Sequence, residues 1–112
     1  MYEIKKTFEI SAAHFLQLDY ESKCSALHGH NWIVTVYLRA KELNSNGMIM
    51  DFTDIKQKLT SKLDHTILNE VLPFNPTAEN LAKYICDTLA PFCYRVCVTE
   101  SENNTASYWS EQ

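Results

Sequence analysis

Apolar and polar residues alternate along four stretches of the chain, a pattern typical of strands that bury one face. The alternation is clearest from Asn31 to Ala40, where every second residue from position 32 is a large apolar one. Residues 2–15 show a similar pattern with charged interruptions. Residues 94–100 and 105–110 alternate again, and Asn103-Asn104 between them predicts a hairpin turn.

Two stretches between these strand pairs carry apolar residues at helical spacing. An apolar residue recurs every three or four positions from Phe52 to Leu63, which predicts a helix over residues 53–62. A second apolar stripe follows Thr77, a capping residue, and Pro91 ends that helix. A turn over residues 44–47 precedes a predicted short strand at residues 48–50.

The order of these elements, ββααββ, predicts an α+β fold. We expect a four-stranded antiparallel sheet from the two hairpin pairs, with both helices on one face. A chain of 112 residues is long enough for one core, so we expect a single domain over residues 1–112.

Composition narrows the function classes. No stretch approaches the ~18 apolar residues of a membrane span, and the first residues lack the apolar core of a signal peptide. We therefore expect no membrane partner and a cytoplasmic location. The net charge of −4 argues against a nucleic-acid surface, which makes a small-molecule partner the better expectation.

The four cysteines form no Cys-x-x-Cys pair, and in a cytoplasmic chain we expect them to be free thiols. Cys86 and Cys97 are predicted to lie in the core and Cys93 in a loop.

The stretch from Cys24 to His30 concentrates the candidate chemistry. His28 and His30 are two positions apart and project from the same face if they begin a strand. His14 ends an earlier strand, and pairing of the two strands would bring all three imidazoles together. Three histidines leave the fourth position of a Zn²⁺ ion open, which is the catalytic arrangement. Alternatively, the histidines are hydrogen-bonded residues at the rim of the sheet.

Three acidic or basic residues elsewhere are further candidates. Asp64 precedes His65 at a helix exit, where the carboxylate could fix the histidine tautomer; such a pair is also a common surface or capping feature. Glu100 follows an alternating strand and would point inward, where a ligand with paired N–H groups could satisfy it. The alternative is that Glu100 turns into solvent at the strand end.

Six short motifs, in this order, resemble the 6-pyruvoyl-tetrahydropterin synthase and 6-carboxy-5,6,7,8-tetrahydropterin synthase family, which has the tunnelling fold (T-fold). They span nearly the whole chain: Ala12-Ala13-His14, Cys24-x-x-x-His28-Gly29-His30, Met50-Asp51-Phe52, Leu63-Asp64-His65-x-x-Leu68-Asn69, Pro76-Thr77-x-Glu79-Asn80-Leu81-Ala82 and Val98-Thr99-Glu100. Each is weak alone, whereas the ordered set is specific.

The resemblance implies a role for each candidate. It implies that His14, His28 and His30 bind Zn²⁺, that Cys24 is the base, and that Asp64 and His65 handle protons. It also implies that Glu100 anchors the guanidine-like edge of a pterin, assisted by Thr77. The implied substrate is 7,8-dihydroneopterin triphosphate, and the implied assembly is a homohexamer of two stacked trimers with active sites between subunits.

Two reactions within the family remain open. The three-residue spacer between Cys24 and His28 resembles the queuosine branch, which forms 6-carboxytetrahydropterin, acetaldehyde and triphosphate. Ala78 points the same way, because pyruvoyl-forming relatives often have a second threonine there. The alternatives are a 6-pyruvoyl-tetrahydropterin synthase, a non-catalytic pterin-binding zinc module, and a closed structural zinc site that includes Cys24.

Overall fold

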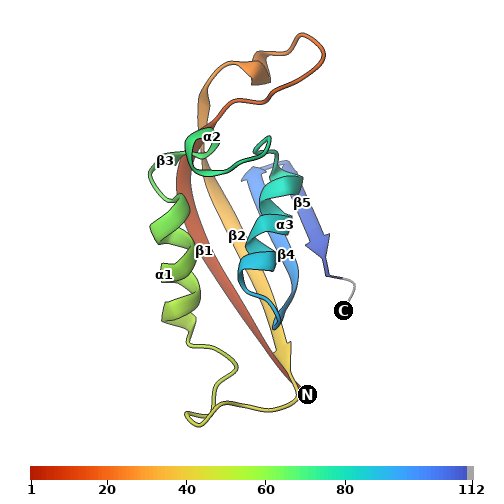
Figure 1. The fold of residues 1–112 in the computed structure, drawn as a ribbon. Helices are drawn as coiled ribbons and strands as arrows, with labels where there is room; N and C mark the ends of the chain where they lie inside the picture. The colour runs from red at the N-terminus through yellow and green to blue at the C-terminus, as the bar shows by residue number, and fades with distance from the viewer. Residues whose placement is uncertain (111–112) are drawn as a thin grey trace.

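A computed structural model describes residues 1–110 as a five-stranded sheet with helices packed on one face (Figure 1). The predicted domain's last two positions, 111 and 112, lie outside the described residues. The elements in chain order are β1 (Tyr2–His14), the 3₁₀ turn η1 (Lys23–Ser25), β2 (His28–Ala40), α1 (Phe52–Leu63), β3 (Thr66–Ile67), α2 (Leu68–Val71), α3 (Ala78–Thr88), β4 (Cys93–Ser101) and β5 (Asn104–Trp109).

The sheet has the order β3-β1-β2-β4-β5. β1 and β2 form a long antiparallel hairpin, in register from Tyr2 opposite Ala40 to His14 opposite His28. β2 pairs with β4, and β4 pairs with β5, also antiparallel. The prediction of a four-stranded antiparallel sheet in ββααββ order is therefore wrong in detail, because β3 joins as a fifth, parallel strand.

The sequence alternation explains which face of the sheet is buried. Side chains of one parity, from Phe8 to Ala12 in β1 and from Trp32 to Leu38 in β2, point toward the helices and are at most 6% exposed. Val96 and Val98 of β4 continue that layer. The other face carries mostly polar residues, and no helix within residues 1–110 packs on it, so the α+β prediction with helices on one face is confirmed (Figure 1).

Both long helices begin at capping side chains. The Asp51 carboxylate accepts the N–H of Thr53 at 2.8 Å, and the Thr77 hydroxyl accepts the N–H of Asn80 at 3.1 Å. The buried stripe of α1 is Ile55, Leu59 and Leu63, and that of α3 is Leu81, Ala82, Ile85 and Cys86. These stripes close the core against the sheet.

Three local predictions differ from the structure. Residues 48–50 form no strand, and α2 and β3 were not predicted, because elements of four and two residues are too short to show a period. Cys97 faces the uncovered side and contacts the Ser107 hydroxyl at 3.2 Å, since it lies between the inward-facing Val96 and Val98. Cys93 is instead buried, because a bulge opposite Tyr37 and Leu38 shifts the register where β4 begins.

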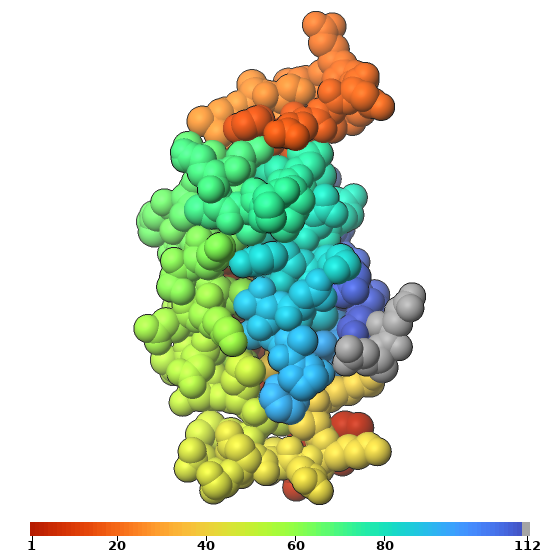
Figure 2. All heavy atoms as spheres, viewed as in Figure 1, coloured from red at the N-terminus to blue at the C-terminus, as the bar shows by residue number. Residues whose placement is uncertain are grey.

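Two loops extend from the opposite ends of the sheet. The β1–β2 connection, residues 15–27, projects at the top of Figure 2, and the β2–α1 connection, residues 41–51, lies at the bottom. The molecule is correspondingly long, 51 × 27 × 26 Å. All four cysteines are free thiols, as predicted. Within residues 1–110, none of the helices has the length and apolarity needed to cross a membrane.

Candidate metal centre and active site

The β1–β2 register brings three histidines together at one end of the hairpin. His14 lies opposite His28, and His30 lies opposite Ala12, so all three side chains project from the helix-covered face of the sheet. One ring nitrogen from each histidine lies within 4.8 Å of the others. The predicted convergence of His14 with His28 and His30 is thus present, and it results directly from strand pairing.

Backbone carbonyls orient two of the three rings. The Nδ1 atom of His14 lies 2.7 Å from the Pro76 carbonyl oxygen, and Nδ1 of His28 lies 2.7 Å from that of Ala26. A carbonyl only accepts, so each Nδ1 carries the proton and the neutral ring presents the lone pair of Nε2. This second hydrogen bond is the usual support of a histidine that binds a metal.

Burial disfavours the charged form of two of the three histidines. His14 is fully buried, and burial lowers the pKa of His14 and of His30, although the Glu100 carboxylate acts in the opposite direction on both. The Nε2 atoms of His14 and His30 are buried without a hydrogen-bond partner. Buried nitrogens with free lone pairs are costly in a core and are what a Zn²⁺ ion binds. The three histidines therefore fit a zinc site.

Glu100 lies beside the histidine cluster and does not turn into solvent, which was the alternative interpretation of the sequence. Its carboxylate oxygens are 3.5 Å from Nε2 of His30 and 3.9 Å from Nε2 of His14, and the side chain is 23% exposed. Glu100 shares the inward parity of Val96 and Val98, which carries the carboxylate toward the histidines.

Glu100 also lines a pocket of about 470 Å³. Its walls come from the β1–β2 loop, the start of α3 and the β4–β5 turn: Leu16, Leu18, Tyr20, Thr77, Ala78, Glu79, Glu100, Asn103, Asn104, Thr105 and Ala106. Glu100 and Thr77 are thus brought to one pocket. The volume is in the range of small-molecule sites.

Cys24 lies half-buried in η1, within the β1–β2 loop. Its N–H donates to the Ser22 hydroxyl at 3.2 Å, and its carbonyl accepts the N–H of Leu16 at 2.9 Å. The group of mutually close metal-binding atoms contains the three histidines but not Cys24. This geometry disfavours the closed structural zinc site.

Asp64 and His65 lie apart from the histidine cluster within the chain. The Asp64 carboxylate accepts the N–H of Ser11 at 2.8 Å and lies 3.6 Å from Nε2 of His65. The His65 side chain is 82% exposed. Its backbone has φ of 58°, a left-handed conformation that costs a residue with a Cβ about 1–2 kcal/mol. The close group of metal-binding atoms contains neither Asp64 nor His65.

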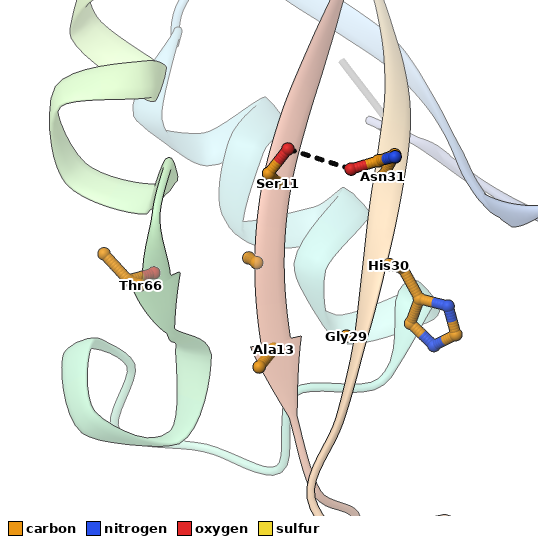
Figure 3. Close-up of a pocket in the computed structure, with 7 residues that line it drawn as sticks. Ser11, Ala13, Gly29, His30, Asn31 and Thr66 are labelled. Carbon is orange, nitrogen blue, oxygen red and sulfur yellow. Dashed lines mark hydrogen bonds between the residues drawn. The ribbon is translucent and has the colours of Figure 1, made fainter.

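A hollow of about 350 Å³ lies on the uncovered face of the sheet at the same end (Figure 3). Ser11 donates to the Asn31 side chain at 2.9 Å across the β1–β2 pair, and the small residues Ala13 and Gly29 leave space beside them. His30 contributes to the edge of this hollow while its ring projects away from it in Figure 3.

The sequence prediction assigned no role to the loop side chains that line the pocket or to the two asparagines that hold the loop, although Asn69 belongs to one of the six motifs. Tyr20 lies between His14 and Cys24 in sequence, a position that could have suggested it. Asn69 and Asn75 each bind the backbone of the loop's first residues. Their partners are 54 and 58 residues away, so no local pattern indicates these contacts.

An α+β fold with three inward-facing histidines beside a carboxylate-lined pocket defines a candidate metal-dependent enzyme. The family described as "6-pyruvoyl tetrahydropterin synthase" matches residues 3–111. The chain belongs to this family, which confirms the resemblance seen in its motifs.

Known proteins of both branches are similar to the chain. The "6-carboxy-5,6,7,8-tetrahydropterin synthase" of Synechocystis sp. is 36% identical, over 98% of this chain and 95% of that protein. The "6-pyruvoyl tetrahydrobiopterin synthase" of Dictyostelium discoideum is also 36% identical, over 80% of this chain and 75% of that protein. The solved 6-pyruvoyl tetrahydropterin synthase of Caenorhabditis elegans superposes with a TM-score of 0.77 at 25% identity, covering 98% and 96% of the two chains.

Proposed function

We propose that the chain is a zinc-dependent lyase that converts 7,8-dihydroneopterin triphosphate to 6-carboxy-5,6,7,8-tetrahydropterin, acetaldehyde and triphosphate in queuosine biosynthesis. One observation carries this proposal: Glu100 lies within 4 Å of two histidines of the cluster and also lines a pocket of about 470 Å³. A substrate in that pocket would have one end at the carboxylate and its side chain within reach of the histidines.

His14, His28 and His30 would hold the Zn²⁺ ion through the ring nitrogens that face one another. Bound there, zinc would supply Lewis-acid stabilisation of negative charge on the side-chain oxygens of the substrate. The carbonyls of Pro76 and Ala26 fix the ring orientations in advance.

Glu100 would anchor the pterin. A guanidine-like edge presents two N–H donors, which a carboxylate accepts in a paired, charge-assisted arrangement. Thr77 lines the same pocket and would assist through its hydroxyl. The hydroxyl already accepts the N–H of Asn80 as the helix cap, which fixes its position.

Cys24 would act as the base that removes a proton from the substrate side chain. A thiolate is the competent form, and a nearby metal ion favours it. Asp64 and His65 would form the second proton-handling pair, in which the carboxylate orients the imidazole. The left-handed backbone of His65 supports this role, because an exposed side chain offers no packing that would offset the strain.

An active site shared between subunits would bring the Asp64–His65 pair of one chain to the three-histidine cluster of another. Asp64 and His65 lie outside the histidine cluster and the His65 side chain is 82% exposed, so we propose that they act on a neighbouring subunit within a homohexamer. The outer strands β3 and β5 leave sheet edges that pairing between copies would cover. Free thiols throughout support a cytoplasmic location.

The runner-up is a 6-pyruvoyl-tetrahydropterin synthase, favoured by the similarity to the Dictyostelium discoideum protein of the related name. A pterin-binding module without turnover is the third candidate. Zinc-loaded protein incubated with 7,8-dihydroneopterin triphosphate distinguishes them through mass spectrometry of the products and a separate acetaldehyde assay. Acetaldehyde with a 6-carboxy product supports the proposal, a 6-pyruvoyl product without acetaldehyde supports the runner-up, and bound pterin without turnover supports the binding module.

A further inference from the structure

The three residues that follow His14 are bound along one edge by two asparagine side chains. Phe15 donates its N–H to Oδ1 of Asn69 at 2.9 Å and accepts from Nδ2 of the same residue at 2.9 Å. Asn75 binds Gln17 in the same way, at 2.9 and 3.2 Å. A side-chain amide has one acceptor and one donor side by side, so each asparagine pairs with a backbone residue as a neighbouring strand would.

The residue between these two is bound on the opposite edge. Successive N–H groups of an extended chain point in opposite directions. Leu16 accordingly donates its N–H away from the asparagines, to the carbonyl oxygen of Cys24 at 2.9 Å. Asn69 and Asn75 on one side and Cys24 on the other therefore hold the same short segment.

The second asparagine is itself tied to the candidate active site. The backbone carbonyl oxygen of Asn75 accepts a hydrogen bond at 2.9 Å from Nδ2 of Asn80, which lies in the first turn of α3. The backbone carbonyl oxygen of the next residue, Pro76, accepts a hydrogen bond from Nδ1 of His14, and Thr77 after it lines the Glu100 pocket. Asn75 thus has a fixed position relative to both the histidine cluster and the pocket.

We propose that Asn69 and Asn75 are positioning residues that set where the Cys24 thiol lies relative to the three histidines and the Glu100 pocket. The inference rests on the proposed function, in which Cys24 is the base. A connection as long as residues 15–27 has many accessible conformations when it is untied. The two amide pairs select one of them, and Leu16 transmits that choice to Cys24.

The test replaces each asparagine by aspartate, which keeps the shape and the acceptor but removes the Nδ2 donor. In the zinc-loaded full chain, Asn69→Asp and Asn75→Asp should lower kcat by about 10- to 100-fold, because a small displacement of a reacting group has that effect. KM should change less than kcat, since Glu100 and Thr77, the proposed pterin anchors, lie outside the released loop, which contributes only part of the pocket wall. The matched control is Asn46→Asp, the same change in an exposed turn of the opposite loop, which should leave kcat unchanged.

A second readout does not depend on turnover. Iodoacetamide labelling followed by peptide mass spectrometry reports the alkylation rate of Cys24, with Cys97 as the internal reference. Release of the loop should raise the Cys24 rate severalfold in both aspartate variants while the zinc content stays at the wild-type value. If an aspartate variant does not fold, the corresponding alanine variant takes its place.

The outcomes separate the two proposals. Unchanged kcat and unchanged Cys24 labelling in folded variants would overturn the positioning role, and so would loss of zinc together with activity. Absence of turnover in the wild-type protein would overturn the proposed function, whereas the labelling comparison would still report whether the asparagines position Cys24.

Discussion

The Nε2 atom of His30 lies 3.5 Å from a carboxylate oxygen of Glu100, so the candidate metal centre and the candidate pterin pocket meet at one side chain. β2 carries the histidine and β4 carries the glutamate, and these strands are paired neighbours. The relationship follows from the register of the sheet. It lets one end of a substrate be held while its other end reaches the histidines.

Removal of a ring from the cluster should abolish zinc binding. We expect His28→Ala to lose the ion because two histidines cannot complete the site, and because His28 is only half-buried the variant should still fold. His65→Ala is the matched control, since this fourth histidine is 82% exposed and outside the cluster. Zinc per chain is measured by elemental analysis after gel filtration. Retention of a full equivalent by His28→Ala would contradict the assignment.

Replacement of the base should stop the reaction without affecting the metal. Cys24→Ala should lower kcat by about 10²–10⁴-fold, the range for loss of a general base, while the zinc content remains that of the wild-type protein. Cys97→Ala, which alters a thiol on the uncovered face, serves as the control and should retain activity. Loss of zinc from Cys24→Ala would show that this cysteine is a ligand and not the base.

Neutralisation of the anchor should weaken substrate binding. Glu100→Gln replaces a charge-assisted pair of hydrogen bonds, and a change of this kind costs about 1.5–3 kcal/mol per bond. The Kd for a pterin measured by calorimetry should therefore rise by about 10-fold or more. Glu102→Gln, an exposed neighbour, provides the comparison. Equal pterin affinity in both variants would mean that another group binds the guanidine-like edge.

The buried thiol of Cys93 should make the free energy of unfolding decrease as the pH becomes alkaline. Burial raises the pKa of Cys93 from 9.0 to about 12, so the folded protein keeps a proton that the unfolded chain loses above pH 9. The stabilisation is fully present below pH 9 and is lost as pH rises toward 12, at about 1.4 kcal/mol per pH unit. Urea unfolding of the wild-type protein and of Cys93→Ala checks this slope. The pH range is from about 8 to about 10.5, which spans the unfolded-state pKa of 9.0. An equally steep loss in both proteins would assign it to other groups.

The sequence predicted what depends on local pattern and pairing. The alternation in β1 and β2 was sufficient to bring His14 beside His28 and His30, because a hairpin with matched parity places them on one face. It could not predict β3, whose two residues join β1 through a contact distant in sequence. The amide pairs of Asn69 and Asn75 were missed for the same reason. Cys93 was misassigned because a bulge changes the parity where β4 begins. The bulge does not explain the error at Cys97, because alternation with the buried Val96 and Val98 already puts Cys97 on the uncovered face.

The zinc-dependent reaction is tested most directly by measuring turnover of 7,8-dihydroneopterin triphosphate as zinc is added back to metal-free protein. Activity should be absent at the start, rise in proportion to the added zinc, and reach a plateau at one ion per chain, the stoichiometry that one three-histidine cluster predicts. Full turnover by the metal-free protein, or a plateau reached equally by His28→Ala, would contradict a zinc-dependent reaction at these histidines.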